Sequence, residues 1–229
     1  MPHAIGRKLT LSFARRFFRD LLLRARRNPI ASMQRRMRLA AVAAARELAV
    51  PRPSWQAIFL KAFAHVSAGN PLLRRCHLSW PWPRWYQHAE TVAAIPVERP
   101  QPTFVLLPGS ETLRLSEVDA ALQEEERIAT LPDASHFALR LGLACSGRVR
   151  AAHCGTFSLS ATQREPVTPF VPALHHGPVD ERDEANVCLT YDLRVLDSFD
   201  AARALGELEQ VLHERILTEL RYIESLEVA

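Results

Sequence analysis

One segment of the chain combines helix signals with apolar residues on nearly every face, and this feature limits the possible folds most strongly. It reads Trp55-Gln-Ala-Ile-Phe-Leu-Lys-Ala-Phe-Ala-His-Val66 and ends at Gly69-Asn70-Pro71. Ser54 precedes it and is a residue type common at helix N-caps. A helix without a polar face is buried on most sides. We therefore expect this helix in the interior, with His65 as a core histidine.

The length and composition favour one soluble globular domain. The chain has 229 residues, 48% of them hydrophobic and 24% charged, and roughly 150 to 250 residues can enclose a single core. The longest uncharged apolar runs, such as 39–45 and 103–107, are far shorter than the ~20 residues of a membrane span. No signal peptide is recognisable, so we expect a cytoplasmic protein. Its cysteines are too widely spaced to predict disulfides or a zinc knuckle; they are Cys76, Cys145, Cys154 and Cys188.

Positive charge is concentrated near the N-terminus. Residues 1–50 hold twelve Lys or Arg and two acids, a balance of +10, whereas the rest holds seventeen and twenty-three, a balance of −6. Residues 11–27 have the spacing of a basic amphipathic helix, so we divide the chain into an N-terminal arm, 1–30, and a body, 31–229. Two interpretations of the arm remain open: its apolar stripe packs on the body, which the pattern favours, or its Arg residues bind an anionic membrane surface. No nucleic-acid partner is expected, because the chain lacks a helix-turn-helix, zinc or RRM signature.

Three further helices are predicted in the body. An Ala-rich segment over 32–48 has high helix propensity and is closed by two prolines. A second, acidic helix is predicted over 116–129, with Ser116 as its N-cap. A third helix is predicted from about residue 199 towards 220, where apolar residues recur at helical spacing.

Strand patterns lie between these helices. They cover 91–97, 103–107 and 148–160, and a β-hairpin is predicted between 169–179 and 186–192 around the acidic turn 180–184. The run Trp80-Pro-Trp-Pro-Arg-Trp85 is too rich in proline for a helix, and we expect it to be extended with its indole rings packed on the body. Helices and strands follow no strict βαβ order. The pattern predicts an α+β fold in which helices cover a mixed sheet.

The end of the predicted hairpin resembles a family motif. The stretch Val187-Cys-Leu-Thr-Tyr-Asp-Leu-Arg-Val-Leu-Asp-Ser-Phe-Asp-Ala-Ala-Arg203 is similar to the signature L-[ST]-[YF]-D-H-R-V-x-D-G of the dihydrolipoamide acyltransferase catalytic domain and the helix after it. Gly155-Thr-Phe-Ser-Leu-Ser160 resembles the family's G-x-F-T-I-S strand, Thr168-Pro169-Phe170 its T-P-I step, and residues 54–68 its buried helix. The resemblance implies a chloramphenicol acetyltransferase-like fold over residues 30–215.

The resemblance also implies roles for single residues. Ser160 stands where the family has a hydroxyl that donates to the tetrahedral oxyanion, and Arg194 and Asp197 stand where it has residues that orient the active-site loop. Leu193 replaces the histidine that acts as general base, and a leucine has no lone pair to accept a proton. Ser198 replaces a glycine, so the backbone there is expected to differ if that glycine served a positive φ.

Other histidines are candidates for the missing base. His175 and His176 are adjacent on a predicted strand, so they point to opposite faces and one of them could reach a substrate channel. A structural role for the pair is favoured by the pattern alone. His153 lies on the strand of Ser160 but is expected on its opposite face. No metal site is predicted, because the spacing shows no set of convergent ligands, and Cys154 is interpreted as a small buried residue.

For the whole protein, the resemblance implies acyl transfer between a coenzyme A or acyl-carrier thioester and an unknown acceptor. It also implies a homotrimer, because the family's active site lies at a trimer interface. No lipoyl attachment is expected, since the basic arm does not resemble a lipoyl domain. Two interpretations remain open: a transferase with a replacement base, and a pseudoenzyme that keeps the trimeric fold as a binding or scaffold protein peripheral to a membrane.

Overall fold

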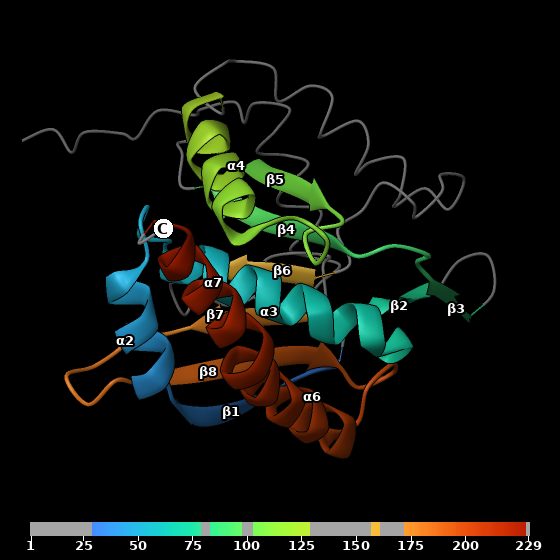
Figure 1. Cartoon of the computed structure of the whole chain (residues 1–229). Coiled ribbons are helices and arrows are strands. Elements are labelled where there is room, and N and C mark those ends of the chain that lie inside the picture. Colours follow the sequence, from blue (N-terminus) through green and yellow to red (C-terminus); the bar gives the residue numbers. More distant parts are fainter. Residues whose placement is uncertain (1–28, 79–82, 98–102, 129–156, 161–171, 228–229) are drawn as a thin grey trace, which may run out of the picture.

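A six-stranded mixed sheet forms the centre of the described part of the chain (Figure 1). The computed structural model describes residues 29–78, 83–97, 103–128, 157–160 and 172–227. The strand order is β1-β8-β7-β6-β4-β5, in which β6 is parallel to both β4 and β7 and the other pairs are antiparallel. The strands are β1 (Ile30–Arg38), β4 (Val92–Val97), β5 (Thr103–Pro108), β6 (Phe157–Ser160), β7 (Ala173–His176) and β8 (Glu184–Asp192). A separate hairpin pairs β2 (Arg75–Leu78) with β3 (Arg84–Gln87).

Helices cover one face of the large sheet (Figure 1). The C-terminal helices α6 and α7 are continuous through a π-helical turn, Leu212–Ile216, and α4 packs against α3. The helices are α2 (Ala40–Leu48), α3 (Trp55–Gly69), α4 (Leu115–Ile128), α6 (Ser198–Val211) and α7 (Leu217–Glu227), with a 3₁₀ turn at Pro71–Arg74 after α3. The predicted α+β class with a mixed sheet is confirmed. None of the helices in the described ranges is long and apolar enough to cross a bilayer.

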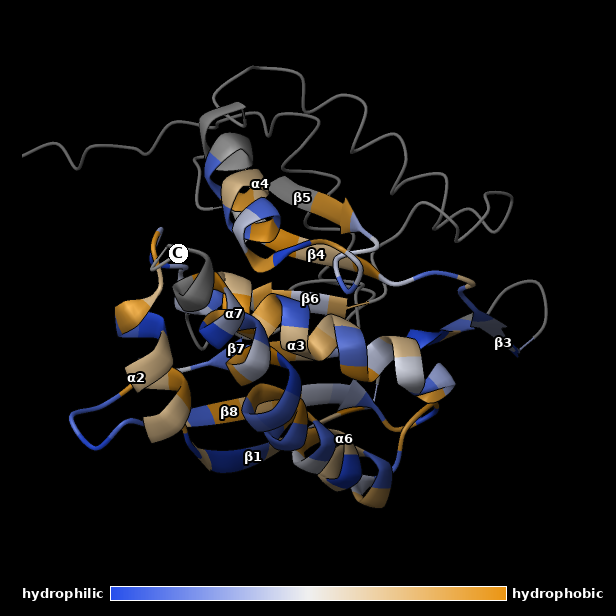
Figure 2. Cartoon of the chain, viewed as in Figure 1, coloured by the Kyte–Doolittle hydropathy of each residue, from blue (hydrophilic) through white to orange (hydrophobic). Residues whose placement is uncertain are grey.

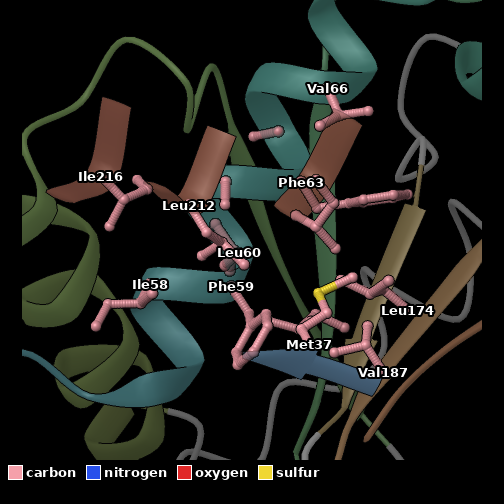
Figure 3. Close-up of a cluster of buried hydrophobic side chains, with 14 of the residues drawn as sticks. Met37, Ile58, Phe59, Leu60, Phe63, Val66, Leu174, Val187, Leu212 and Ile216 are labelled. Carbon is pink, nitrogen blue, oxygen red and sulfur yellow. The ribbon is translucent and has the colours of Figure 1, made fainter. Parts of the chain in front are cut away.

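The interior position predicted for α3 is confirmed. The Ser54 hydroxyl caps it by accepting from the Ala57 N–H at 3.1 Å. On the sheet side, Phe63 makes an edge-on contact with Phe157 at a centroid distance of 4.9 Å. Figure 3 shows α3 between the C-terminal helices and the sheet; the labelled partners are Leu212 and Ile216 on one side and Met37, Leu174 and Val187 on the other. His65 is only half-buried, and burial lowers its pKa below the ordinary value.

The prediction of one helix over 32–48 is wrong in its first half. Residues Ile30–Arg38 form β1 and pair with β8 along their whole length, with Ile30 opposite Asp192 and Arg38 opposite Glu184. The ladder with β8 outweighs the local helix propensity, as tertiary context often does. β1 is an edge strand and hydrophilic in Figure 2, and charged edges of this kind resist pairing with other chains. Only the part from Ala40 onward is helical.

Most other predicted elements are confirmed. The strands at 91–97 and 103–107 and the hairpin of β7 and β8 are present. The N-cap prediction for Ser116 is wrong, because α4 begins at Leu115 and the Glu117 carboxylate accepts from the Arg114 N–H instead. The final helix starts at Ser198. The predicted helix at 11–27 and residues 148–156 of the predicted strand lie outside the described ranges.

Candidate active site

The turn after β8 is fixed by a carboxylate at its first residue. Asp192 is buried, and its Oδ1 accepts from the Arg194 backbone N–H at 2.9 Å and from the Arg194 Nε at 2.9 Å. The Arg194 Nη2 donates to Asp192 Oδ2 at 2.5 Å, and this hydrogen bonding raises the pKa of Arg194. The Asp192 carbonyl accepts from the N–H groups of Val195 and Leu196 at 2.9 and 3.0 Å. Among the described residues, the ion pair of Arg194 is with Asp192, and a guanidinium held in this way stabilises the turn.

The helix after the turn begins with a side-chain cap. Asp197 is the N-cap of α6 and accepts from the Asp200 N–H at 2.8 Å, so its carboxylate satisfies a free donor of the first turn. The buried Tyr191 hydroxyl donates to Ser198 Oγ at 3.1 Å. Ser198 is the first residue of α6, and Asp183 is the one non-glycine residue with positive φ in the described ranges. The replacement of the family's glycine by Ser198 therefore imposes no strained backbone.

Leu193 lies at the exposed tip of this turn. Its side chain is 51% exposed, and its backbone N–H donates to the Pro29 carbonyl at 2.9 Å, which joins the turn to the chain entering β1. The position to which the resemblance assigns the general base is thus accessible to a reactant. A leucine there contributes apolar surface and no proton acceptor.

The β2–β3 hairpin supports the same turn from outside. The Trp85 Nε1 donates to the Arg194 carbonyl at 3.0 Å, and the Arg75 guanidinium lies 5.7 Å from the Trp85 ring centroid. Trp85 is nonetheless 60% exposed, so the predicted packing of the indole rings on the body is wrong for this residue. Cys76 lies on the same hairpin, where burial and the Asp192 carboxylate raise its pKa to about 11. It is a protonated thiol at neutral pH and a poor nucleophile.

A second group of candidate residues lies across the middle of the sheet. Ser160 ends β6 and is paired in register with His175 of β7, which is in turn opposite Cys188 of β8. Positions paired in register share a face of the sheet, and this is the face opposite to Leu174 and His176. The backbone position of Ser160 is described, whereas its side chain and the candidates His153 and Cys154 lie outside the described part.

His176 has a structural role. Its ring stacks on Phe59 of α3 with centroids 4.7 Å apart and planes at 13°. Its Nδ1 lies 3.3 Å from the Gly177 carbonyl. Burial is the largest influence on this histidine and lowers its pKa, while the contact with the Gly177 carbonyl opposes the shift and the neighbouring His175 adds to it. The structure thus separates the two adjacent histidines, as the strand pattern predicted, and places His176 in the core.

The two groups are separated along the sheet: the turn follows the end of β8, and His175 is paired with the middle of β8. Cys188, which is opposite His175, and Asp192, which begins the turn, are separated along β8 by about 13 Å at 3.3 Å per residue. Leu193 lies beyond Asp192, so within one chain it is remote from Ser160. One group, around the turn after β8, consists of Leu193, Arg194 and Asp197. The other consists of Ser160 and His175, which are paired on adjacent strands.

Sequence reasoning missed several residues that organise the turn. Tyr191 donates to Ser198, and Trp85 donates to Arg194. These residues meet only in the folded chain, so no local sequence pattern predicts the two hydrogen bonds. The role of Asp197 could have been found, because an aspartate directly before a helical pattern signals an N-cap. In the described ranges, no group of three or more His, Cys, Asp or Glu residues is placed to hold a metal ion.

Comparisons with known proteins agree with this architecture. No protein-family model and no curated protein matches the sequence. Among solved structures, a probable dihydrolipoamide acetyltransferase from Listeria monocytogenes is similar at a TM-score of 0.70 and 15% identity, over 91% of this chain and 95% of that one. A truncated catalytic core of the 2-oxoacid dehydrogenase multienzyme complex from Thermoplasma acidophilum is similar at 0.68 and 12%, over 91% and 99%. Chloramphenicol acetyltransferase is similar at 0.54 and 14%, over 88% and 96%.

These neighbours confirm the resemblance inferred from the motif of β8 at the level of the fold. The similarity extends over nearly the whole of each neighbour, so the described strands and helices form one shared architecture rather than a shared fragment. The chain therefore has the chloramphenicol acetyltransferase-like fold of dihydrolipoamide acetyltransferase catalytic cores.

Proposed function

We propose that the protein transfers an acyl group between a coenzyme A thioester, or an acyl-carrier thioester, and an acceptor with a thiol, hydroxyl or amine. One observation carries this proposal: the fold is shared along nearly the full length of proteins named as acetyltransferases, and the turn after β8 keeps the motif residues apart from Leu193 and Ser198. In this proposal Ser160 donates to the oxyanion that forms on the thioester carbonyl. Asp197 and Arg194 act as positioning residues, because their side chains hold the turn.

The proposed active form is a homotrimer. Because Leu193 is remote from Ser160 within one chain, a site that uses both the turn after β8 and Ser160 requires a second copy of the chain. Size-exclusion chromatography with light scattering tests this directly, and a monomer at assay concentration contradicts it.

The assay of the function measures free coenzyme A released from a panel of acyl-CoA thioesters, with and without small thiol and amine acceptors. The native protein is compared with Ser160→Ala and Leu193→His. Loss of one oxyanion donor lowers kcat by about 100-fold or more, so release that disappears in Ser160→Ala supports the transferase. Equal release by the native protein and Ser160→Ala contradicts it.

A second candidate function is favoured by Leu193 itself. A leucine that is 51% exposed at the position of the base suits a pseudoenzyme that binds rather than transforms its ligand. Release by Leu193→His but not by the native protein would identify this case, because the site would then lack only its base. The Arg-rich sequence of residues 11–27 suits a cytoplasmic protein peripheral to an anionic membrane. Co-sedimentation with vesicles containing phosphatidylserine, lost at raised salt, tests that part.

A further inference from the structure

The fold leaves open which residue accepts the proton that Leu193 cannot accept. We propose that His175 is the general base of this protein, an inference that rests on the proposed acyl transfer. It places the base in the middle of the sheet, beside Ser160, rather than on the turn after β8.

The register of the sheet brings His175 to this position. β6 and β7 are parallel neighbours, and their ladder pairs Ser160 with His175. Paired positions on adjacent strands are about 4.8 Å apart, so one thioester carbonyl group can lie within reach of both. A general base acts at hydrogen-bond distance from the proton it removes, and this register puts the two proposed groups on adjacent strands of a single chain.

The face of the sheet distinguishes His175 from its neighbour. Leu174 and His176 belong to the face covered by helices, where the His176 ring stacks on Phe59. Strand alternation puts His175 on the other face, away from α2, α3, α6 and α7 (Figure 1). Of the two histidines, His176 is therefore held in the helical core, and His175 shares its face of the sheet with Ser160.

The described neighbours of His175 on this face are small. Ser158 and Ala173 precede Ser160 and His175 on their strands, and Cys188 is opposite His175. All four side chains whose burial is described here, His175 included, are buried. Among the described residues, the titratable neighbours are Cys188 across the ladder and His176 along the strand. Burial keeps water away from this imidazole, and exclusion of water strengthens the hydrogen bonds that it makes.

The step assigned to His175 is balanced in protons. His175 in its neutral form takes the proton from the acceptor's thiol, hydroxyl or amine as that atom bonds to the thioester carbonyl carbon. The resulting tetrahedral oxyanion collapses, the carbon–sulfur bond breaks, and the imidazolium returns the proton to the leaving thiolate. The products are the acylated acceptor and free coenzyme A.

The test compares His175→Gln and His175→Ala with the matched core variant His176→Ala, using the coenzyme A release assay. General bases contribute roughly 10² to 10⁴ in rate, so kcat is expected to fall by about 100-fold or more in both His175 variants. Added imidazole is expected to restore part of the activity of His175→Ala, since it can occupy the vacated space as a free base. It should not increase the activity of His176→Ala, and circular dichroism establishes that all three variants are folded.

The outcomes separate this inference from the proposed function. Undiminished release by His175→Gln, or activity lost in folded His175→Ala that imidazole does not restore, overturns the role of His175 and leaves acyl transfer standing. Release by Leu193→His alone overturns it in favour of a pseudoenzyme. An absence of release from both the native protein and Leu193→His overturns the base and the acyl transfer together.

Discussion

A buried ion pair joins three helices and offers a sharp test of the packing. The Lys61 Nζ on α3 donates to Glu219 Oε1 on α7 at 2.6 Å, and the same oxygen accepts from the Leu115 N–H at the start of α4 at 2.7 Å. The Lys61 side chain is 6% exposed and that of Glu219 is 24% exposed. The perturbation is removal of each partner in turn, by Lys61→Met and Glu219→Gln.

The exposed fractions of the Lys61 and Glu219 side chains determine which variant is expected to be less stable. Removing one partner of a buried pair destabilises a protein by about 3–5 kcal/mol, because the other charge is left uncompensated. In Lys61→Met the remaining carboxylate keeps the Leu115 N–H and some contact with water, so the loss is expected at about 2–3 kcal/mol. In Glu219→Gln the ammonium of Lys61 is left in a site with little access to water, and the loss is expected at about 3–4 kcal/mol.

Urea unfolding at fixed protein concentration measures both values, and the double variant completes a thermodynamic cycle. The double variant is expected to lose less than the sum of the two single losses, with a coupling energy of about 1–3 kcal/mol. Arg52→Ala, which removes an exposed pair with Glu47, is the control and should change stability by less than about 1 kcal/mol. Losses below about 0.5 kcal/mol in both single variants, or Lys61→Met being less stable than Glu219→Gln, would refute the reasoning.

Three further predictions concern titration, capping and thiol reactivity. Burial lowers the pKa of His65, His88 and His176. Stability should therefore be full above about pH 6.5 and decline below it, where the unfolded chain binds protons that the folded protein does not. Thermal unfolding over a pH series should show a less steep loss of stability at acid pH in His176→Gln, and an unchanged loss contradicts the prediction. Asp197→Ala, which removes the N-cap of α6, should lower the free energy of unfolding by about 1 kcal/mol. Asp197→Asn should retain most of the stabilisation that the cap contributes, and urea unfolding measures both variants. The pKa of Cys76 is raised to about 11, so the native protein should react with a disulfide reagent at pH 7 far more slowly at this thiol than at the same thiol in urea; equal rates would show that the carboxylate and the burial do not protect it.

The elements that could be predicted from sequence are those whose signals are local. Ser54 caps α3, and the apolar surface of α3 on all sides predicted its interior position. The strand β1 could not be recognised, because Ile30–Arg38 contains good helix formers and acquires its extended form only by pairing with β8, more than a hundred residues away. Met33 and Met37 pack on the core, but a spacing of four fits a helix as well as a strand, and propensity and the Ala-rich continuation favoured a helix.

In the candidate site, too, some features follow from local sequence patterns and others depend on the whole fold. Alternation on β7 was enough to place His175 and His176 on opposite faces, and the structure identifies which of them enters the core through the stacking of His176 on Phe59. The pairing of Ser160 with His175 depends on the register between two parallel strands, which no local pattern sets. The support of the turn by Trp85 required the hairpin of β2 and β3 to be placed beside the turn after β8, and this is a property of the whole fold.

The motif that led to the fold also has a physical reason to persist without its chemistry. Asp192 binds two backbone N–H groups through its carbonyl and Arg194 through its carboxylate, Asp197 caps α6, and Tyr191 bonds to Ser198. Each of these contacts stabilises the passage from β8 to α6, and none of them involves the side chain at position 193, which points to solvent. Replacing a histidine by Leu193 therefore costs the fold little, whereas replacing Asp192 or Asp197 would expose unpaired backbone donors. The motif residues around Leu193 accordingly indicate the fold, and they do not by themselves indicate catalysis.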